Sequence, residues 1–243
     1  LLKQPKEDVV GFNLMLKKMK LDRKRERRDK PFLGGALFNY AQHQKESSFV
    51  IRPALKAIKK MNPSTLMATY QGIVENYKVD ISYVGNALLD SVKNALEKKI
   101  DLFGNNKETP NKDRDRIKIP YDKVIVIHDK KAIQSQLYFY VPDHKRALSE
   151  YPRWKAFNSY FAGGFSGIMM QEIREYRSLA YGVQGGYVIP ENSDGYFYAY
   201  IGCQSDKTIK AITVLDSLLK QMPRKPERLA ALKKRLKLST VSN

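Results

Sequence analysis

The spacing of apolar residues predicts a helical first part of the chain. Apolar residues alternate with charges over residues 5–29, which favours a helix running into a polar end. Pro31 and the pair Gly34 and Gly35 are expected to end this helix. The pattern then predicts short helices over 53–60, 62–76 and 91–99, and alternation of apolar and polar residues predicts a strand over 79–86.

Strands and helices alternate in the second part of the chain. Strands are predicted over residues 123–128, 135–141, 181–189 and 195–203, and helices over 153–161, 166–176, 207–221 and 227–238. Strand pairs that alternate with helix pairs indicate an α+β fold in which an antiparallel-rich sheet carries helices on one face.

A polar stretch separates the two parts. Residues 104–120 hold few large apolar side chains, so burial cannot offset the cost of ordering them, and we interpret them as a linker. Residues 1–103 are then expected to close one α/β domain, and residues 121–243 to form a second one.

Composition narrows the class of protein. The chain has 243 residues, 42% of them hydrophobic, enough for a buried core, and it contains no apolar run of membrane-spanning length. The start at Leu1 carries neither an initiator Met nor a signal-peptide pattern, which suggests an internal fragment and leaves the compartment open. The single cysteine, Cys203, excludes an internal disulfide and is expected to be a small buried hydrophobe.

The net charge of +19 is strong enough to attract nucleic acid, anionic lipid or acidic peptides. It is concentrated in residues 17–30 and 220–237, both of which we interpret as solvated helix faces. No aromatic residues flank the first run to stack on bases, so nucleic-acid binding by residues 17–30 is the less favoured alternative.

The most informative run covers residues 158–187. Gly163 and Gly164 allow a sharp junction between helices, and Ser166 is placed to cap the second of these. The side chains expected to face inward from that helix are Ile168, Met169 and Ile173.

Arg174 and Tyr181 are the candidate binding residues of this run. Arg174 lies near the end of the predicted helix, and Tyr181 begins the next strand seven residues later. A short turn between them can bring both side chains to one edge of the sheet. The guanidinium offers a fixed fork of donors and the phenol offers one, a pair suited to holding peptide carbonyls.

This run also resembles a known family. The sequence G-G-F-S-G-I-M-M-Q-E-I-R-E-Y-R-S-L-A-Y is similar to the C-terminal, non-catalytic half of insulinase/pitrilysin-type (inverzincin) zinc metallopeptidases. The resemblance implies a two-layer α/β sandwich of the mitochondrial-processing-peptidase-like type and a peptide substrate. It also implies a zinc-binding catalytic half as partner, in the same polypeptide or in another subunit. In the family, the first Arg and the Tyr of this pattern bind the substrate backbone, and they correspond to Arg174 and Tyr181 here.

The zinc site of the family is not complete in this sequence. The family binds zinc through H-x-x-E-H and a distant Glu, because the metal needs three protein ligands and an open position. Here residues 43–47 read His-Gln-Lys-Glu-Ser, so Ser47 replaces the second histidine. We therefore expect no metal ligand and no catalytic residue in this chain, and a zinc ion bound outside it. The resulting interpretation is the substrate-binding half of a metalloendopeptidase, with a catalytically inactive scaffold or binding protein as the alternative.

The remaining chemistry-bearing residues favour structural interpretations. The three histidines, His43, His128 and His144, are expected on the surface or in loops. Glu172 and Glu175 are expected to form salt bridges rather than to act as catalytic acids. Alternation places Tyr196, Tyr198 and Tyr200 on one face of a strand, which is expected to be covered by helices or to line a chamber wall.

Overall fold

The structure is a computed structural model that describes residues 6–76, 81–99, 116 and 123–241. The chain divides into two compact units, one formed by residues 1–25 and 53–112, the other by residues 26–52 and 113–243. Residues 26–52 therefore group with the C-terminal part of the chain. The linker predicted over 104–120 lies, apart from Arg116, outside the described residues, and the predicted domain boundaries stay a prediction.

The described part of the first unit is helical. Its helices are α1 (Val9–Glu26), α3 (Leu55–Lys59), α4 (Pro63–Asn76) and α5 (Leu89–Lys99), as the sequence predicts. Arg23 of α1 donates a hydrogen bond of 2.6 Å to the carbonyl oxygen of Pro53. The predicted strand at 79–86 is wrong for its described residues 81–86, which form no strand. An alternating pattern does not form a strand unless a neighbouring strand satisfies its backbone hydrogen bonds. Val84 is 99% exposed, so this segment does not pack against a core.

A helix that the sequence did not predict follows α1. Helix α2 spans Lys30–His43, so Pro31 and the two glycines Gly34 and Gly35 lie inside a helix rather than ending one. The carboxylate of Asp29 caps this helix by accepting a hydrogen bond of 3.0 Å from the backbone of Phe32. Pro31 is tolerated there because the first-turn N–H groups need no helical partner. At Gly34, a Cβ would collide with Gln136 and Tyr138, so glycine permits close approach to the sheet.

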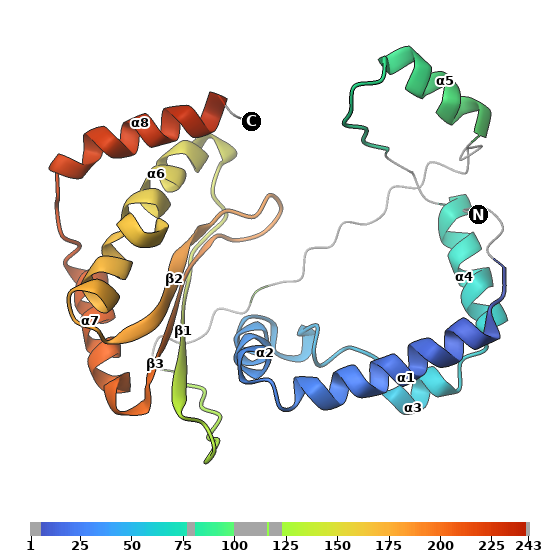
Figure 1. The fold of residues 1–243 in the computed structure, drawn as a ribbon, viewed down its shortest axis with the longest axis horizontal. Helices are drawn as coiled ribbons and strands as arrows, with labels where there is room; N and C mark the ends of the chain where they lie inside the picture. The colour runs from blue at the N-terminus through green and yellow to red at the C-terminus, as the bar shows by residue number, and fades with distance from the viewer. Residues whose placement is uncertain (1–5, 77–80, 100–115, 117–122, 242–243) are drawn as a thin grey trace. The chain divides into compact units, whose positions relative to one another are not determined.

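The second unit contains a three-stranded antiparallel sheet with the order β1-β3-β2 (Figure 1). Its strands are β1 (Gln134–Pro142), β2 (Ala180–Val188) and β3 (Tyr196–Gln204). Residues 123–128, predicted as a strand, are irregular in the structure. Strand β2 therefore has β3 on one side and no strand on the other within the described part of the chain.

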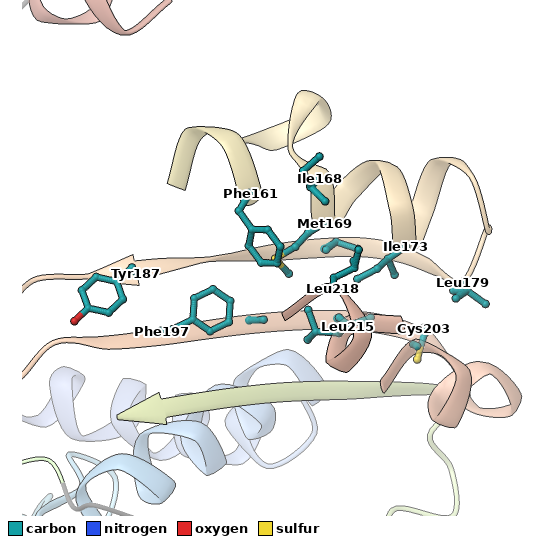
Figure 2. Close-up of a cluster of buried hydrophobic side chains, with 14 residues drawn as sticks. Phe161, Ile168, Met169, Ile173, Leu179, Tyr187, Phe197, Cys203, Leu215 and Leu218 are labelled. Carbon is teal, nitrogen blue, oxygen red and sulfur yellow. The ribbon is translucent and has the colours of Figure 1, made fainter. Parts of the chain in front are cut away.

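The helices on one face of the sheet form the core with it. These are α6 (Tyr151–Phe161), a π-helical segment η4 (Met170–Glu175), α7 (Thr208–Lys220) and α8 (Glu227–Val241). The 3-10 turns are η1 (Gln44–Glu46), η2 (Leu148–Glu150), η3 (Gly164–Ser166) and η5 (Ser205–Lys207). Figure 2 shows side chains of η4 and α6 pointing at those of β2 and β3. The predicted inward-facing residues are confirmed, since Ile168, Met169 and Ile173 are at most 1% exposed.

This arrangement confirms the α+β class, with one addition. Helix α2 packs against the opposite, tyrosine-bearing face, where Phe38 stacks on Tyr138 at 5.1 Å between ring centroids. Helix α2 therefore provides part of the cover predicted for Tyr196, Tyr198 and Tyr200. The ring centroids of Phe38 and Tyr198 are 6.4 Å apart. The sequence did not predict α2 on this face, because Gly34 and Gly35 were expected to end a helix.

The basic C-terminal stretch is more than a solvated face. Arg235 of α8 donates hydrogen bonds of 3.0 Å to the Ser166 hydroxyl and to the Ser159 carbonyl oxygen. Arg228 donates to the Ser166 carbonyl oxygen at 3.1 Å. These arginines therefore fasten α8 to the turn between α6 and η4. The sequence had suggested that Ser166 caps the following helix. This prediction is wrong, because Ser166 lies in η3.

Candidate functional site

The site begins where the π-helical segment turns into strand β2. The backbone N–H of Leu179 bonds to the Ile173 carbonyl oxygen and that of Ser178 to the Arg174 carbonyl oxygen, both at 2.9 Å. Ser178 adopts a positive φ of 48°, a conformation that non-glycine residues rarely adopt. Lys207 donates a hydrogen bond of 3.0 Å to the Ser178 carbonyl oxygen. A tight, anchored turn thus fixes the path of the chain between Arg174 and Tyr181.

Arg174 lies on the last turn of η4 with its side chain 39% exposed. Its Nε is 3.6 Å from a carboxylate oxygen of Glu175, and its guanidinium carbon is 5.7 Å from the centroid of the Phe165 ring. A third contact joins it to the sulfur of Met170 at 4.0 Å. These contacts are weak in a solvated setting, so the guanidinium keeps donors available for a ligand.

Tyr181 occupies an irregularity at the start of β2. Ala180 pairs with Cys203 and Gly182 with Gly202, so Tyr181 is the extra residue of a β-bulge. The bulge directs its ring over Gly202, where a Cβ would lie 2.7 Å from the phenol oxygen. Tyr181 is 45% exposed, and β-bulges commonly re-aim a side chain in this way.

The Tyr181 phenol also joins a cluster of tyrosines. Burial, followed by the nearby hydroxyl of Tyr181, raises the pKa of Tyr200 to about 12. Burial, again followed by Tyr181, raises the pKa of Tyr138. The phenols of Tyr138 and Tyr200 therefore stay protonated over the physiological range and can donate hydrogen bonds.

Arg174 and Tyr181 thus precede and begin the same edge strand, but each contacts its own neighbours. Arg174 contacts residues of η3 and η4, whereas Tyr181 contacts β3. A ligand that reached both would have to run along the start of β2.

The glutamates of the motif are structural, as predicted. Burial alone would raise the pKa of Glu172, but hydrogen bonds from Arg177 at 2.5 Å and Lys225 at 3.1 Å outweigh it, and the pKa is lowered. Glu175 is the ion-pair neighbour of Arg174. Glu172 therefore ties the end of η4 to the segment before α8 and is not available as a general acid.

Sequence reasoning assigned no role to Asn158, although it begins the informative run. Its side-chain amide accepts a hydrogen bond of 2.6 Å from the Tyr187 N–H and donates one of 2.8 Å to the Tyr187 carbonyl oxygen. Its sequence context gave no signal, because α6 contains other polar residues as well, among them Lys155 and Ser159. Its partner on β2 could be identified only from the tertiary structure.

Residues 43–47 do not fit a zinc site. His43 ends α2 and is only 9% exposed, so the expected surface position is wrong. Ser47 is fully buried, and its hydroxyl donates a hydrogen bond of 2.8 Å to the Asn39 side chain. No group of three potential ligands was found among the described residues. His128 is exposed, and His144 is a surface residue 2.7 Å from Asp143.

Cys203 is fully buried, as expected, and burial raises the pKa of its thiol. No helix of the described residues is long and apolar enough to cross a membrane.

Comparison with known proteins identifies the family. The profile of the family described as "Peptidase M16 inactive domain" matches residues 61–236, most of the chain. The chain belongs to this M16 family. The predicted kinship with metallopeptidases is therefore confirmed, and the chain is a non-catalytic, peptidase-like member of that family. A comparison with curated proteins found no match.

Solved structures share the fold of this M16 chain. A peptidase M16 inactive domain from Pseudomonas fluorescens is 16% identical with a TM-score of 0.68, and the match covers 100% of this chain and 59% of that one. A protease from Helicobacter pylori is 14% identical with a TM-score of 0.69, covering 100% and 60%. The periplasmic protease PqqL from Escherichia coli is 13% identical with a TM-score of 0.71, covering 94% and 25%. The chain thus spans about 60% or less of these three proteins.

Proposed function

We propose that this chain is the substrate-binding, metal-free half of a zinc-dependent M16 metalloendopeptidase. Arg174 and Tyr181 would hold the backbone of a bound polypeptide near the bond to be cleaved. The observation that carries the proposal is their position before and at the start of β2, which has a free edge in the described part of the chain. Both side chains are partly exposed, so both can reach a ligand.

The free edge supplies a general way to bind polypeptide. An extended segment can add to β2 through main-chain hydrogen bonds, which gives affinity with little dependence on sequence. The charged fork of Arg174 and the neutral donor of Tyr181 would then bond to carbonyl oxygens of that segment. Zinc would be bound by the other half, in the same polypeptide or a partner subunit, because residues 43–47 do not supply its ligands.

The test uses the complex of this chain with its catalytic half. Arg174→Lys keeps the charge but removes the donor fork, and Tyr181→Phe keeps the ring over Gly202 but removes the hydroxyl. We expect Arg174→Lys to lower kcat/KM for peptide hydrolysis by roughly 10- to 100-fold, because a hydrogen bond involving a charged group contributes about 1.5–3 kcal/mol. We expect Tyr181→Phe to lower it by roughly 2- to 10-fold, because a neutral hydrogen bond contributes about 0.5–1.5 kcal/mol. Zinc content should not change.

Matched controls lie in the same motif. Arg177→Lys preserves the ion pair with Glu172, and Tyr176 is a 62% exposed phenol, so Tyr176→Phe tests an unrelated hydroxyl. Both controls should retain wild-type turnover. Wild-type turnover in the Arg174 and Tyr181 variants would refute the proposed role of these two residues.

An inactive scaffold or binding protein is the second candidate. It is favoured by the unsuitable donor set at residues 43–47, with Ser47 already bonded to Asn39. A complex with any catalytic half that binds peptide but never cleaves it would support this alternative.

A further inference from the structure

The pairing register of β2 determines which of its main-chain groups face the free edge. Val183 lies opposite Ile201, Gly185 opposite Ala199 and Tyr187 opposite Phe197. The N–H and carbonyl groups of Tyr187 bond to the Asn158 side chain, so they point away from β3. In an antiparallel ladder these directions alternate along the strand. The main-chain groups of Gly185 and Val183 therefore also face the free edge.

Asn158 occupies the position that an added strand would take at Tyr187. Its amide offers one acceptor and one donor, as a residue of a neighbouring strand does, and it uses both on the same residue of β2. We propose that Asn158 is a positioning residue that ends the peptide-binding edge at Tyr187 and leaves Gly185 and Val183 to pair with substrate. This inference rests on the proposed function.

A cavity next to Gly185 leaves room for the added strand that this role requires. A cavity of about 330 Å³ lies between α6 and β2. Its lining includes Lys155, Asn158, Ser159, Gly163, Gly185 and Gly186. At Gly186 a Cβ would lie 3.1 Å from the Asn158 amide oxygen, so glycine allows the amide to reach the edge. The space beside Gly185 therefore remains for a polypeptide backbone.

A fixed end of the edge has a consequence for substrate register. Sliding an added strand by one residue would reverse the direction of every side chain, so a stop restricts the choice of register. Between Tyr181 and Tyr187 the strand extends about 20 Å at about 3.3 Å per residue. A segment of roughly five or six residues therefore fits along β2 between the position of Tyr181 and the Asn158 amide. Asn158 would thereby decide which peptide bond lies nearest to Arg174 and Tyr181.

The inference can be tested by residue-resolved amide hydrogen exchange on the whole chain. The probe is a capped, unstructured peptide that alternates Thr, which favours strands, with Glu, whose negative charge suits a basic chain. In the wild type we expect the Tyr187 amide to be protected without peptide, and the Val183 and Gly185 amides to gain protection of at least about 10-fold when peptide is added. Tyr187 should not change on adding peptide.

Variants of Asn158 should extend the part of the β2 edge that is free to pair with peptide. In Asn158→Ala, Tyr187 should lose its intrinsic protection and gain protection from the peptide. Asn158→Leu, which keeps the approximate size of the side chain but can neither accept from the Tyr187 N–H nor donate to its carbonyl oxygen, serves if the alanine variant does not fold. The exposed Asn192 provides a matched control, and Asn192→Ala should behave as the wild type.

The outcomes separate this inference from the proposed function. If the peptide alters Tyr187 in the wild type, or if Asn158 variants leave its protection unchanged, the inference is wrong while peptide binding by β2 stands. If the peptide protects no residue of β2, the proposed function is refuted, and with it the role of Asn158 toward substrate. Both the inference and the proposed function are supported if the peptide protects only Val183 and Gly185 in the wild type and also protects Tyr187 in the Asn158 variants.

Discussion

Replacing Tyr187 by Phe tests how β2 is held to Asp143, the residue that follows β1. The Tyr187 ring stacks on Trp154 of α6 with 3.8 Å between centroids, and its hydroxyl donates a hydrogen bond to the carboxylate of Asp143. Burial would raise the pKa of Asp143, but hydrogen bonds from Tyr187, the His144 backbone and Arg146 lower it from 3.8 to about 2. Phe keeps the stack and removes only the hydroxyl.

The magnitude follows from the pKa shift. A fall from 3.8 to about 2 corresponds to about 2.5 kcal/mol at 1.36 kcal/mol per unit. Three donors share it, and the carboxylate side chain is 23% exposed, so we assign about 1 kcal/mol to the phenol of Tyr187. Tyr187→Phe should therefore lower the free energy of unfolding at pH 7 by about 1 kcal/mol.

The pH dependence gives the prediction its sign. A carboxylate whose pKa is lowered in the folded state stabilises the fold above its ordinary pKa, and this contribution is lost as pH falls through about 2. The difference between wild type and Tyr187→Phe should therefore shrink between pH 4 and pH 2. Burial, then the bond to Asp143, raises the pKa of Tyr187 to about 12, so on the alkaline side the hydroxyl's contribution is lost as pH rises from 10 through 12.

Denaturant unfolding followed by tryptophan fluorescence measures this directly, because Trp154 is the single tryptophan of the chain. Tyr160→Phe is a matched control. Its hydroxyl donates to the Pro223 carbonyl oxygen and accepts from the Lys225 backbone, each at 2.7 Å, so no carboxylate is involved. Its cost should not vary between pH 2 and pH 7. An equal cost of Tyr187→Phe at both pH values would refute the role of Asp143.

Two further predictions concern the start of β2. Ser178→Gly should raise the free energy of unfolding by up to about 1 kcal/mol, because glycine adopts the positive φ of 48° without strain; thermal denaturation that shows a clear loss would contradict this reading of the turn. Gly202→Ala should displace the Tyr181 ring, since the new Cβ would lie 2.7 Å from its phenol oxygen, and peptide hydrolysis by the complete enzyme should fall as in Tyr181→Phe. Full activity of a folded Gly202→Ala enzyme would show that the observed ring position is not needed.

The sequence by itself determined the elements with strong periodicity and the local motif. Helices α6, α7 and α8 and the strands β1, β2 and β3 were predictable because their apolar residues repeat at the period of the element. The run around Arg174 was informative because its glycines, its buried apolar residues and the strand that follows are close in sequence. The family kinship was visible in that run.

Tertiary structure alone decided the partners. Residues 81–86 and 123–128 have strand-like patterns but form no strand with any described part of the chain, because pairing depends on neighbours distant in the sequence. Helix α2 contains Pro31 and two glycines, which local propensity counts against a helix, yet Gly34 lets it approach Tyr138 closely. The amide of Asn158 meets Tyr187 across 29 positions of sequence. Periodicity reports which face of an element is buried, whereas contacts between distant residues depend on how the elements pack, and only the folded chain specifies that.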